Sequence, residues 1–249
     1  TSGLLLMAAA IVALFLANSR WAEDYLHFIH TPALIGIGDW GIRMSLHHWV
    51  NDALMAIFFF VVGLELKREL LVGELSDIKQ AALPIVAAIG GMVVPAFIFE
   101  VFNYGSDAAH GWGVPMATDI AFAVGALALL GKRVPKALIT FLVALAIADD
   151  LGAVLVIALF YTQNLALNWL LVAVALTAIL MTLNYAGIRN AIPYFIIAVM
   201  LWYAMLQSGV HATLAGVIGA FTVPARSKYD PKLFADMVKQ HIEKFIANR

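Results

Sequence analysis

Long apolar runs separated by short polar connections make up most of this chain. The runs cover residues 3–19, 45–66, 82–103, 112–131, 136–162, 168–187, 191–207 and 210–224. An apolar run of about 20 residues is long enough to cross a bilayer as an α-helix. The pattern therefore predicts an all-α membrane protein, with a bundle of about eight transmembrane helices over residues 1–225.

The composition supports the same class of protein. Hydrophobic residues make up 63% of the 249 residues and charged residues 12%, whereas soluble domains contain about 45–50% and about 25%. The net charge of −1 gives no sign of a nucleic-acid partner, and a cysteine count of 0 excludes thiol chemistry. We expect the lipid bilayer to surround most of the chain, and we expect no cofactor.

The distribution of basic residues predicts the orientation of the bundle. If the N-terminus is cytoplasmic, 13 of the 15 lysines and arginines fall in or beside the inner connections, and only Arg20 and Arg43 lie outside. Cytoplasmic loops of membrane proteins carry an excess of Lys and Arg, and the opposite orientation would reverse this bias. We therefore expect a multi-pass protein with a cytoplasmic N-terminus.

Two segments outside the apolar runs have patterns of their own. The outer loop 20–45 holds Gly36, Gly38 and Gly41 among residues that favour strands, so a short β-hairpin is expected there. The tail 226–249 has apolar residues at helical spacing but too many charges to span, which predicts an amphipathic helix on the cytoplasmic surface. The chain starts without methionine and ends without a helix stop signal, so we expect the native protein to continue beyond it.

Two adjacent carboxylates, Asp149 and Asp150, are the only charges in the run 137–161. An Asp at the centre of a membrane helix costs about 2.5–3.5 kcal/mol, so the pair costs roughly 5–7 kcal/mol, a burden that points to a function. Neighbouring carboxylates in a low dielectric disfavour joint ionisation, so protons and a small metal cation would compete for the pair. That competition is a mechanism for exchange. The alternative is a buried, hydrogen-bonded pair with a structural role only.

A second candidate site is the stretch Ala117-Thr118-Asp119. Its apolar surroundings are interrupted at Gly111, Gly113, Pro115 and Gly125. A span broken around a polar centre is typical of the discontinuous helices that line transport sites. Thr118 and Asp119 are therefore candidate ion- or proton-binding residues. The alternative is that one of them only caps a helix N-terminus.

Two weaker signals lie near the predicted ends of spans. Glu65, Arg68 and Glu69 have the spacing of one helix face at a cytoplasmic end, where a surface salt-bridge cluster is the commoner explanation. The functional interpretation is a charged funnel that attracts cations or senses pH. His211 lies at the start of the last predicted span, and histidine titrates near physiological pH, although a lone interfacial His is more often structural.

Five stretches of this sequence together resemble the NhaA family of bacterial Na⁺/H⁺ antiporters. The resemblance runs from about Gly3 to Pro224. The stretches are NDALMAIFFFVVGLELKREL, AALPIVAAIGGMVVPA, ATDIAFAVGALALLG, ALAIADDLGAV and SGVHATLAGV. The order and spacing of ATDIAFA and DDLGA are the most specific part. The resemblance implies an inverted-repeat fold with a discontinuous helix, of which this chain would hold the first eight of about twelve spans.

The resemblance also implies roles for the candidate residues. Asp150 would be the principal carboxylate for Na⁺, Li⁺ and protons, and Asp149 would be its partner in ion binding or in a salt bridge to a later helix. Thr118 and Asp119 would lie at the chain break near the ion site. The pH-responsive residues would be Glu65, Arg68, Glu69 and His211.

The function implied by the resemblance is electrogenic antiport in the bacterial inner membrane. The protein would use the proton gradient to expel Na⁺ or Li⁺, support pH homeostasis, and form a homodimer through the outer loop. It would be a transporter and not an enzyme. The alternatives are another cation channel, a proton-coupled symporter, or an intramembrane aspartyl protease, which would need its two carboxylates on facing helices and not side by side.

A transport assay on the chain itself tests the expectation that it is incomplete. Relative to the family, the last four spans are missing, together with a second broken helix and a membrane lysine that would compensate buried charge. We therefore expect these 249 residues alone not to exchange Na⁺ for protons. Sodium flux into vesicles that contain only this polypeptide checks the expectation, and measurable exchange would overturn it.

Overall fold

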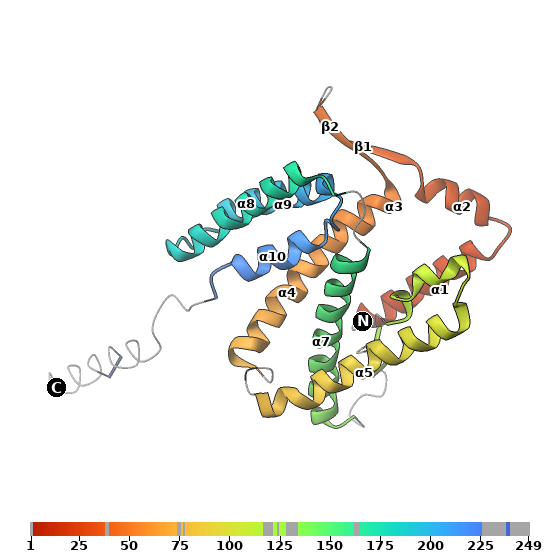
Figure 1. Ribbon diagram of the computed structural model, residues 1–249, viewed down its shortest axis with the longest axis horizontal. Helices are drawn as coiled ribbons and strands as arrows, with labels where there is room; N and C mark the ends of the chain where they lie inside the picture. Colours follow the sequence, from red (N-terminus) through yellow and green to blue (C-terminus); the bar gives the residue numbers. More distant parts are fainter. Residues whose placement is uncertain are drawn as a thin grey trace, which may run out of the picture.

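The computed structural model is a bundle of helices with one two-stranded hairpin (Figure 1). The structure describes residues 2–37, 40–73, 76, 78–116, 122–123, 125–127, 134–161, 165–225 and 238–239. The elements in chain order are α1 (Ser2–Ala17), α2 (Ala22–Ile29), β1 (Pro32–Ile37), β2 (Trp40–Ser45), α3 (Leu46–His48), the π-helical turn η1 (Trp49–Leu54), α4 (Met55–Val72), α5 (Ile78–Asn103), the 3-10 turns η3 (Asp107–Gly111) and η4 (Val114–Met116), α7 (Lys136–Phe160), α8 (Leu167–Tyr185), α9 (Ala191–Ser208) and α10 (Leu214–Thr222).

Among the residues that the structure describes, five helical stretches are long and apolar enough to cross a membrane. They are Leu46–Val72, Ala81–Asn103, Ala137–Phe160, Leu167–Tyr185 and Ala191–Ser208. A sixth results if the pair Gly3–Ala17 and Ala22–Ile29, which is bent by 116°, counts as one broken span. Each of the five overlaps an apolar run predicted from the sequence, so the prediction of a polytopic helical membrane protein is confirmed.

The other three predicted spans are not established. The run 3–19 forms α1, which ends where Asn18 and Ser19 donate side-chain hydrogen bonds back to carbonyls of its last turn. The run 112–131 lies partly outside the described residues. α10 has 9 residues, about 14 Å of helix, which is less than half of a hydrocarbon core of about 30 Å. The count of eight spans and the inverted repeat therefore stay predictions, and the tail 226–249 lies outside the described residues except for Val238 and Lys239.

The predicted outer loop folds into a short helix followed by the hairpin. α2, a helix that the hydrophobic pattern does not predict, carries Glu23 and Asp24 in its first turn, where acidic side chains complement the helix dipole. β1 and β2 pair antiparallel, with Pro32 opposite Ser45. In Figure 1 the hairpin projects away from the helices.

Two tryptophans fix the start of α4 against its neighbours. The indole Nε1 of Trp49 donates to the carbonyl of Ala33 at 3.2 Å, which links η1 to β1. The indole Nε1 of Trp202 on α9 donates to the carbonyl of Asp52 at 2.8 Å. The two rings stack with their centroids 6.3 Å apart. The hairpin, α4 and α9 are therefore joined at one point.

Small residues allow α4 and α10 to pack closely. A Cβ atom at Gly63 would lie 2.8 Å from the Cβ of Ala220, and one at Gly216 would overlap the carbonyl oxygen of Ala56. Interfaces between membrane helices are enriched in small residues, because close backbone approach replaces the missing hydrophobic driving force. α5 packs on α7 and α8 packs on α9 in the same structure.

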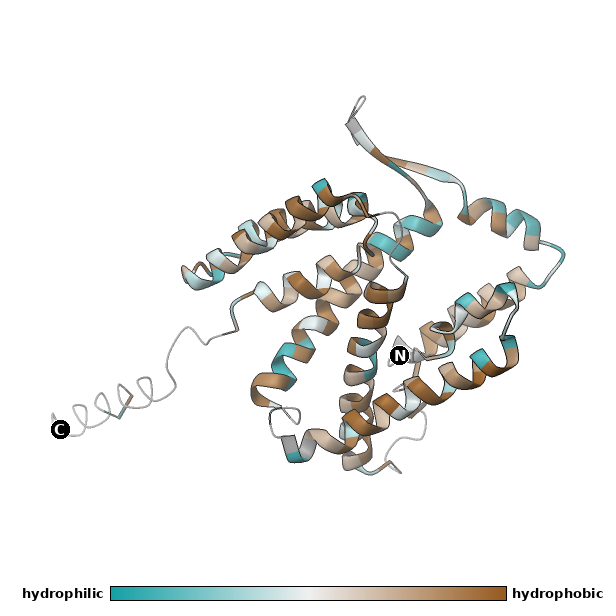
Figure 2. Ribbon diagram, in the orientation of Figure 1, coloured by the Kyte–Doolittle hydropathy of each residue, from teal (hydrophilic) through white to brown (hydrophobic). Residues whose placement is uncertain are grey.

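The outer surface of the long helices is apolar. Phe102 on α5 is 84% exposed, and Figure 2 shows α5 and α7 as predominantly hydrophobic, with hydrophilic residues gathered on α2 and toward the end of α4. A water-soluble surface does not expose such continuous apolar area. The distribution is that of helices surrounded by lipid.

The close contact between α4 and α10 predicts different effects for two glycine substitutions. Gly216→Ala would press a methyl group against the Ala56 carbonyl, and such overpacking costs about 1–3 kcal/mol. Gly90→Ala on α5 is the matched control, because a Cβ there meets no atom of the described residues within 4 Å. We expect a lower melting temperature in detergent for Gly216→Ala only. Equal melting temperatures for the two variants would contradict the close packing.

Candidate functional site

The aspartate pair lies in the second half of α7, on two different faces of the helix. Asp149 is buried, with an exposed fraction of 2%, whereas Asp150 is half-buried. Adjacent helical residues point about 100° apart, so one carboxylate can be enclosed while the next is partly accessible. Each residue has an interaction within the protein, and one oxygen of each, Asp149 Oδ1 and Asp150 Oδ2, is buried without a hydrogen-bond donor among the described residues.

The α7 helix is packed tightly beside the pair. Gly152 follows Asp149 by three residues and therefore shares its face. A Cβ at Gly152 would overlap the sulfur of Met92 on α5. Ala146 and Ala153 are also buried, with exposed fractions of 1% and 7%. Small side chains on both sides of Asp149 thus let neighbouring helices approach and shield this carboxylate from lipid.

Metal binding by the aspartates would need further ligands. Among the described residues, there is no group of three or more His, Cys, Asp or Glu side chains arranged to hold a metal ion. Carboxylate oxygens are hard ligands that suit small, hard cations, so Asp149 and Asp150 can supply part of a cation site. Backbone carbonyls or a hydroxyl would have to complete it.

The candidate residues Thr118 and Asp119 lie outside the described residues. On one side of them, η4 ends at Met116, which is 5% exposed. On the other side, Gly125 contacts α1 so closely that a Cβ at this position would lie 3.0 Å from the Cα of Gly3. The structure therefore fixes the neighbours of the predicted chain break but does not place the break itself.

Tyr161 links the end of α7 to the segment that leads to Thr118. Its hydroxyl donates to the carbonyl of His110 and accepts from the backbone N–H of Gly113, both at 2.9 Å. A Cβ at Gly113 would lie 2.8 Å from this hydroxyl, so any other residue at this position would displace the Tyr161 hydroxyl. The ring of Trp112 packs against the ring of Tyr161, with the two ring centroids 6.1 Å apart. The Asp149–Asp150 helix and the predicted broken span are thereby joined at one end.

The residues predicted to sense pH lie on other elements. Glu65 and Arg68 are exposed near the end of α4, and Glu69 is half-buried, with its carboxylate folded against Gly73. His211 is half-buried in the turn between α9 and α10, where its carbonyl accepts from the N–H of Leu214. The structure thus places the aspartate pair on α7, the proposed pH-responsive cluster (Glu65, Arg68 and Glu69) on α4, and His211 in the turn before α10.

Sequence reasoning missed two residues that connect these elements. Tyr161 has no sequence signal that sets it apart from other interfacial tyrosines. Lys67 counted only as one of the inner positive charges, but its ammonium reaches α10. The spacing of Ala56, Phe60, Gly63 and Lys67 places them on one face of α4, but this spacing does not identify the acceptors that Lys67 binds.

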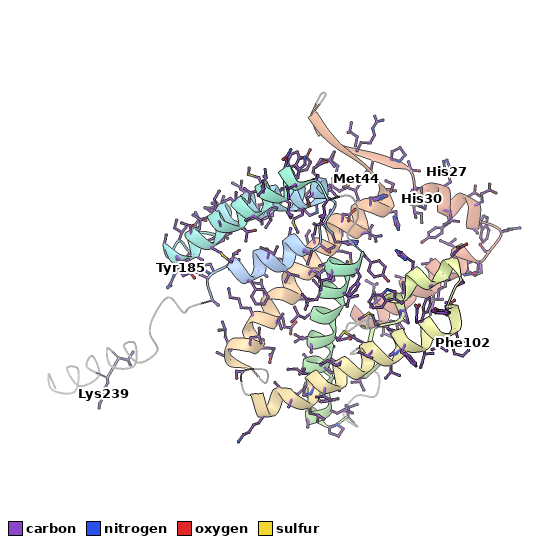
Figure 3. The ribbon with its side chains drawn as sticks, viewed as in Figure 1. His27, His30, Met44, Phe102, Tyr185 and Lys239 are labelled. Carbon is purple, nitrogen blue, oxygen red and sulfur yellow. The ribbon has the colours of Figure 1, made fainter. Side chains whose placement is uncertain are left out.

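The Tyr161 contact predicts a selective loss on removal of one oxygen. Tyr161→Phe deletes both hydrogen bonds and keeps the ring, and each neutral bond contributes about 0.5–1.5 kcal/mol. Tyr185→Phe is the matched control, because Tyr185 is 92% exposed at the end of α8 (Figure 3). We expect a lower melting temperature only for Tyr161→Phe. An unchanged melting temperature in that variant would refute the linking role.

The sequence is similar to a known family over nearly all of its length. The model of the family described as Na⁺/H⁺ antiporter 1 matches residues 1–248. A Na⁺/H⁺ antiporter NhaA 1 from Saccharophagus degradans is 60% identical over 98% of this chain and 53% of the relative. A Na⁺/H⁺ antiporter NhaA from Sulfurimonas denitrificans is 55% identical over 98% of this chain and 55% of the relative.

A third relative gives the same picture. The Na⁺/H⁺ antiporter NhaA of Wolinella succinogenes is 52% identical over 99% of this chain and 55% of its own length. The chain therefore spans about half the length of the curated relatives that it matches. On the match over residues 1–248 and these identities, the chain belongs to the Na⁺/H⁺ antiporter 1 family, and the relatives named here are NhaA antiporters.

Proposed function

We propose that the protein to which this chain belongs exchanges Na⁺ or Li⁺ for protons across the bacterial inner membrane. The observation that carries the proposal is the placement of Asp149 and Asp150 in the second half of a membrane-spanning helix, one buried and one partly accessible. Its family membership and the antiporter names of its relatives support the choice of exchange over channel conduction or symport.

The chemistry follows from competition for the two carboxylates. A bound cation stabilises both in the ionised form, and protons bound to the carboxylates lower their affinity for a cation. Asp150 is the principal site because it is the more accessible of the two, and Asp149 is its enclosed partner. When the pair is accessible from the outer side of the membrane, protons driven by the proton gradient bind the two carboxylates and the cation is released. In this proposal more protons than cations cross the membrane in each cycle. The transport is therefore electrogenic.

Other residues complete the proposed site and its control. Thr118 and Asp119 contribute ligands or compensating charge at the break of the discontinuous span. Glu65, Arg68, Glu69 and His211 adjust the activity to pH, and their different elements require that this control act through contacts between helices. The protein works as a homodimer associated through the hairpin of β1 and β2, which projects from the helices (Figure 1).

An intramembrane aspartyl protease fits the structure less well. A proteolytic pair of carboxylates must face each other across a water molecule. Asp149 and Asp150 instead follow one another on the same helix, α7, so their directions differ by about 100°. The arrangement suits joint binding of an ion with help from a second element.

Replacement of one carboxylate tests the proposal directly. In the protein as its gene encodes it, we expect addition of Na⁺ or Li⁺ to release protons, and we expect Asp150→Asn to abolish the release because an amide does not exchange a proton for a cation. Asp107→Asn is the matched control, since Asp107 is exposed in η3 and should keep the response. Proton release is followed with a pH indicator on purified protein.

The outcomes of this measurement separate the possibilities. Unchanged proton release in Asp150→Asn would remove Asp150 from the mechanism. Movement of Na⁺ and protons in the same direction in vesicles would replace exchange by symport. Cation flux without any proton release would indicate a channel.

A further inference from the structure

Lys67 lies on the face of α4 that packs against α10. Ala56, Phe60, Gly63 and Lys67 are separated by four, three and four residues, which is the spacing of one helix face. Gly216 of α10 approaches the backbone of Ala56 and Phe60, and Gly63 approaches the backbone and side chains of α10. Lys67 therefore continues, by one turn, the contact face that the small residues begin.

The ammonium group of Lys67 caps the C-terminus of α10. Its Nζ donates to the carbonyl of Phe221 at 2.6 Å and to the carbonyl of Val223 at 2.5 Å, while α10 ends at Thr222. The last carbonyls of a helix lack partners within the helix, and the negative end of the helix dipole favours a cation. α10 carries no ionisable side chain of its own, and in the part of the chain that the structure describes the charge bound at its C-terminal end is Lys67 of α4.

The same turn of α4 carries the proposed pH-responsive cluster on another face. Glu65 and Glu69 are each two residues from Lys67, which turns their side chains about 160° away from it. Lys67 thus joins the cluster-bearing end of α4 to one end of α10, while His211 lies beyond the other end of α10.

We propose that Lys67 is a positioning residue that makes the end of α4 and the end of α10 one mechanical unit during transport. Its functional consequence rests on the antiport function proposed above, whereas the contact itself does not. Without Lys67, α10 would separate from α4 at its C-terminal end, and the two helices would no longer move together. Asp149 and Asp150 lie on α7, and their proposed binding of the cation does not involve Lys67. Loss of Lys67 should therefore lower the rate of transport and leave the apparent affinity for Na⁺ unchanged.

A single cysteine reports on the contact without any transport measurement. Thr222 is 2% exposed beside the two carbonyls that Lys67 binds, and the 249 residues contain 0 cysteines. In the protein as its gene encodes it, with any cysteine beyond these 249 residues replaced by serine, we expect Thr222→Cys to react slowly with N-ethylmaleimide. Adding Lys67→Met should raise the labelling rate about tenfold, since charge-assisted hydrogen bonds are lost.

Two further variants control for charge and for nonspecific effects. Lys67→Arg keeps a cation that can donate to both carbonyls, so labelling and transport should return close to those of the parent protein. Lys239→Met removes a lysine of the same type from an exposed position distant from α4 (Figure 3), and it should change neither measurement.

Transport measurements complete the test. With Lys67→Met we expect a lower maximal rate of Na⁺/H⁺ exchange at an unchanged half-saturating Na⁺ concentration, and recovery of the rate with Lys67→Arg. Unchanged labelling in Lys67→Met overturns the contact. Raised labelling with a normal maximal rate overturns the positioning role. If the parent protein shows no exchange but labelling rises as expected, the proposed function fails while the contact stands.

Discussion

Hydrogen bonds from side chains to backbone carbonyls of neighbouring elements hold this bundle in register. Lipid gives helices no hydrophobic reason to associate, so close packing and interhelical hydrogen bonds must supply the free energy. Here the donors are the long side chains of Trp49, Trp202, Tyr161 and Lys67. Each reaches a carbonyl in a turn or near the end of an element, where backbone acceptors are available because the helical pattern is interrupted.

This kind of contact determines how the candidate site is positioned. α7 is fixed at its C-terminal end through Tyr161 and along its length through the close approach of Gly152 to α5. η1, which leads directly into α4, is fixed through Trp202, and the end of α4 is fixed through Lys67. The aspartate pair and the proposed pH-responsive cluster therefore lie on two helices, α7 and α4, that are held by separate contacts. A change at the cluster can affect the pair only through the packing of α4 against its neighbours.

Much of the architecture could be predicted from the sequence, because its cause is local. A run such as 82–103 or 191–207 contains enough apolar residues to span, whatever it contacts, and the apolar pattern of both predicts the helices α5 and α9 correctly. The shortness of α10 could not be predicted, because the run 210–224 is apolar throughout. Its first residues instead form the turn after Gly209, whose φ of +80° ends α9.

The site was predictable only in part, for the same physical reason. A pair of charges in an apolar run is visible in the sequence because it violates the local pattern, and so Asp149 and Asp150 stand out. Tyr161 and Lys67 violate nothing: an aromatic ring and a lysine are both expected near the ends of membrane helices. Their importance comes from acceptors 51 to 156 residues away in the chain, and such long-range contacts appear only in the folded structure.

The surroundings of Asp149 provide the strongest physical argument that the pair is used and not merely tolerated. A carboxylate on a lipid-facing surface would carry a high free-energy cost. The small residues Ala146, Gly152 and Ala153 reduce the width of α7 around Asp149. Neighbouring helices can then enclose the carboxylate at the cost of giving up large apolar contacts in that part of α7. A bundle optimised for stability alone would place large apolar side chains there and no carboxylate. The presence of these charges together with small residues around them suits the ion-binding role proposed for α7.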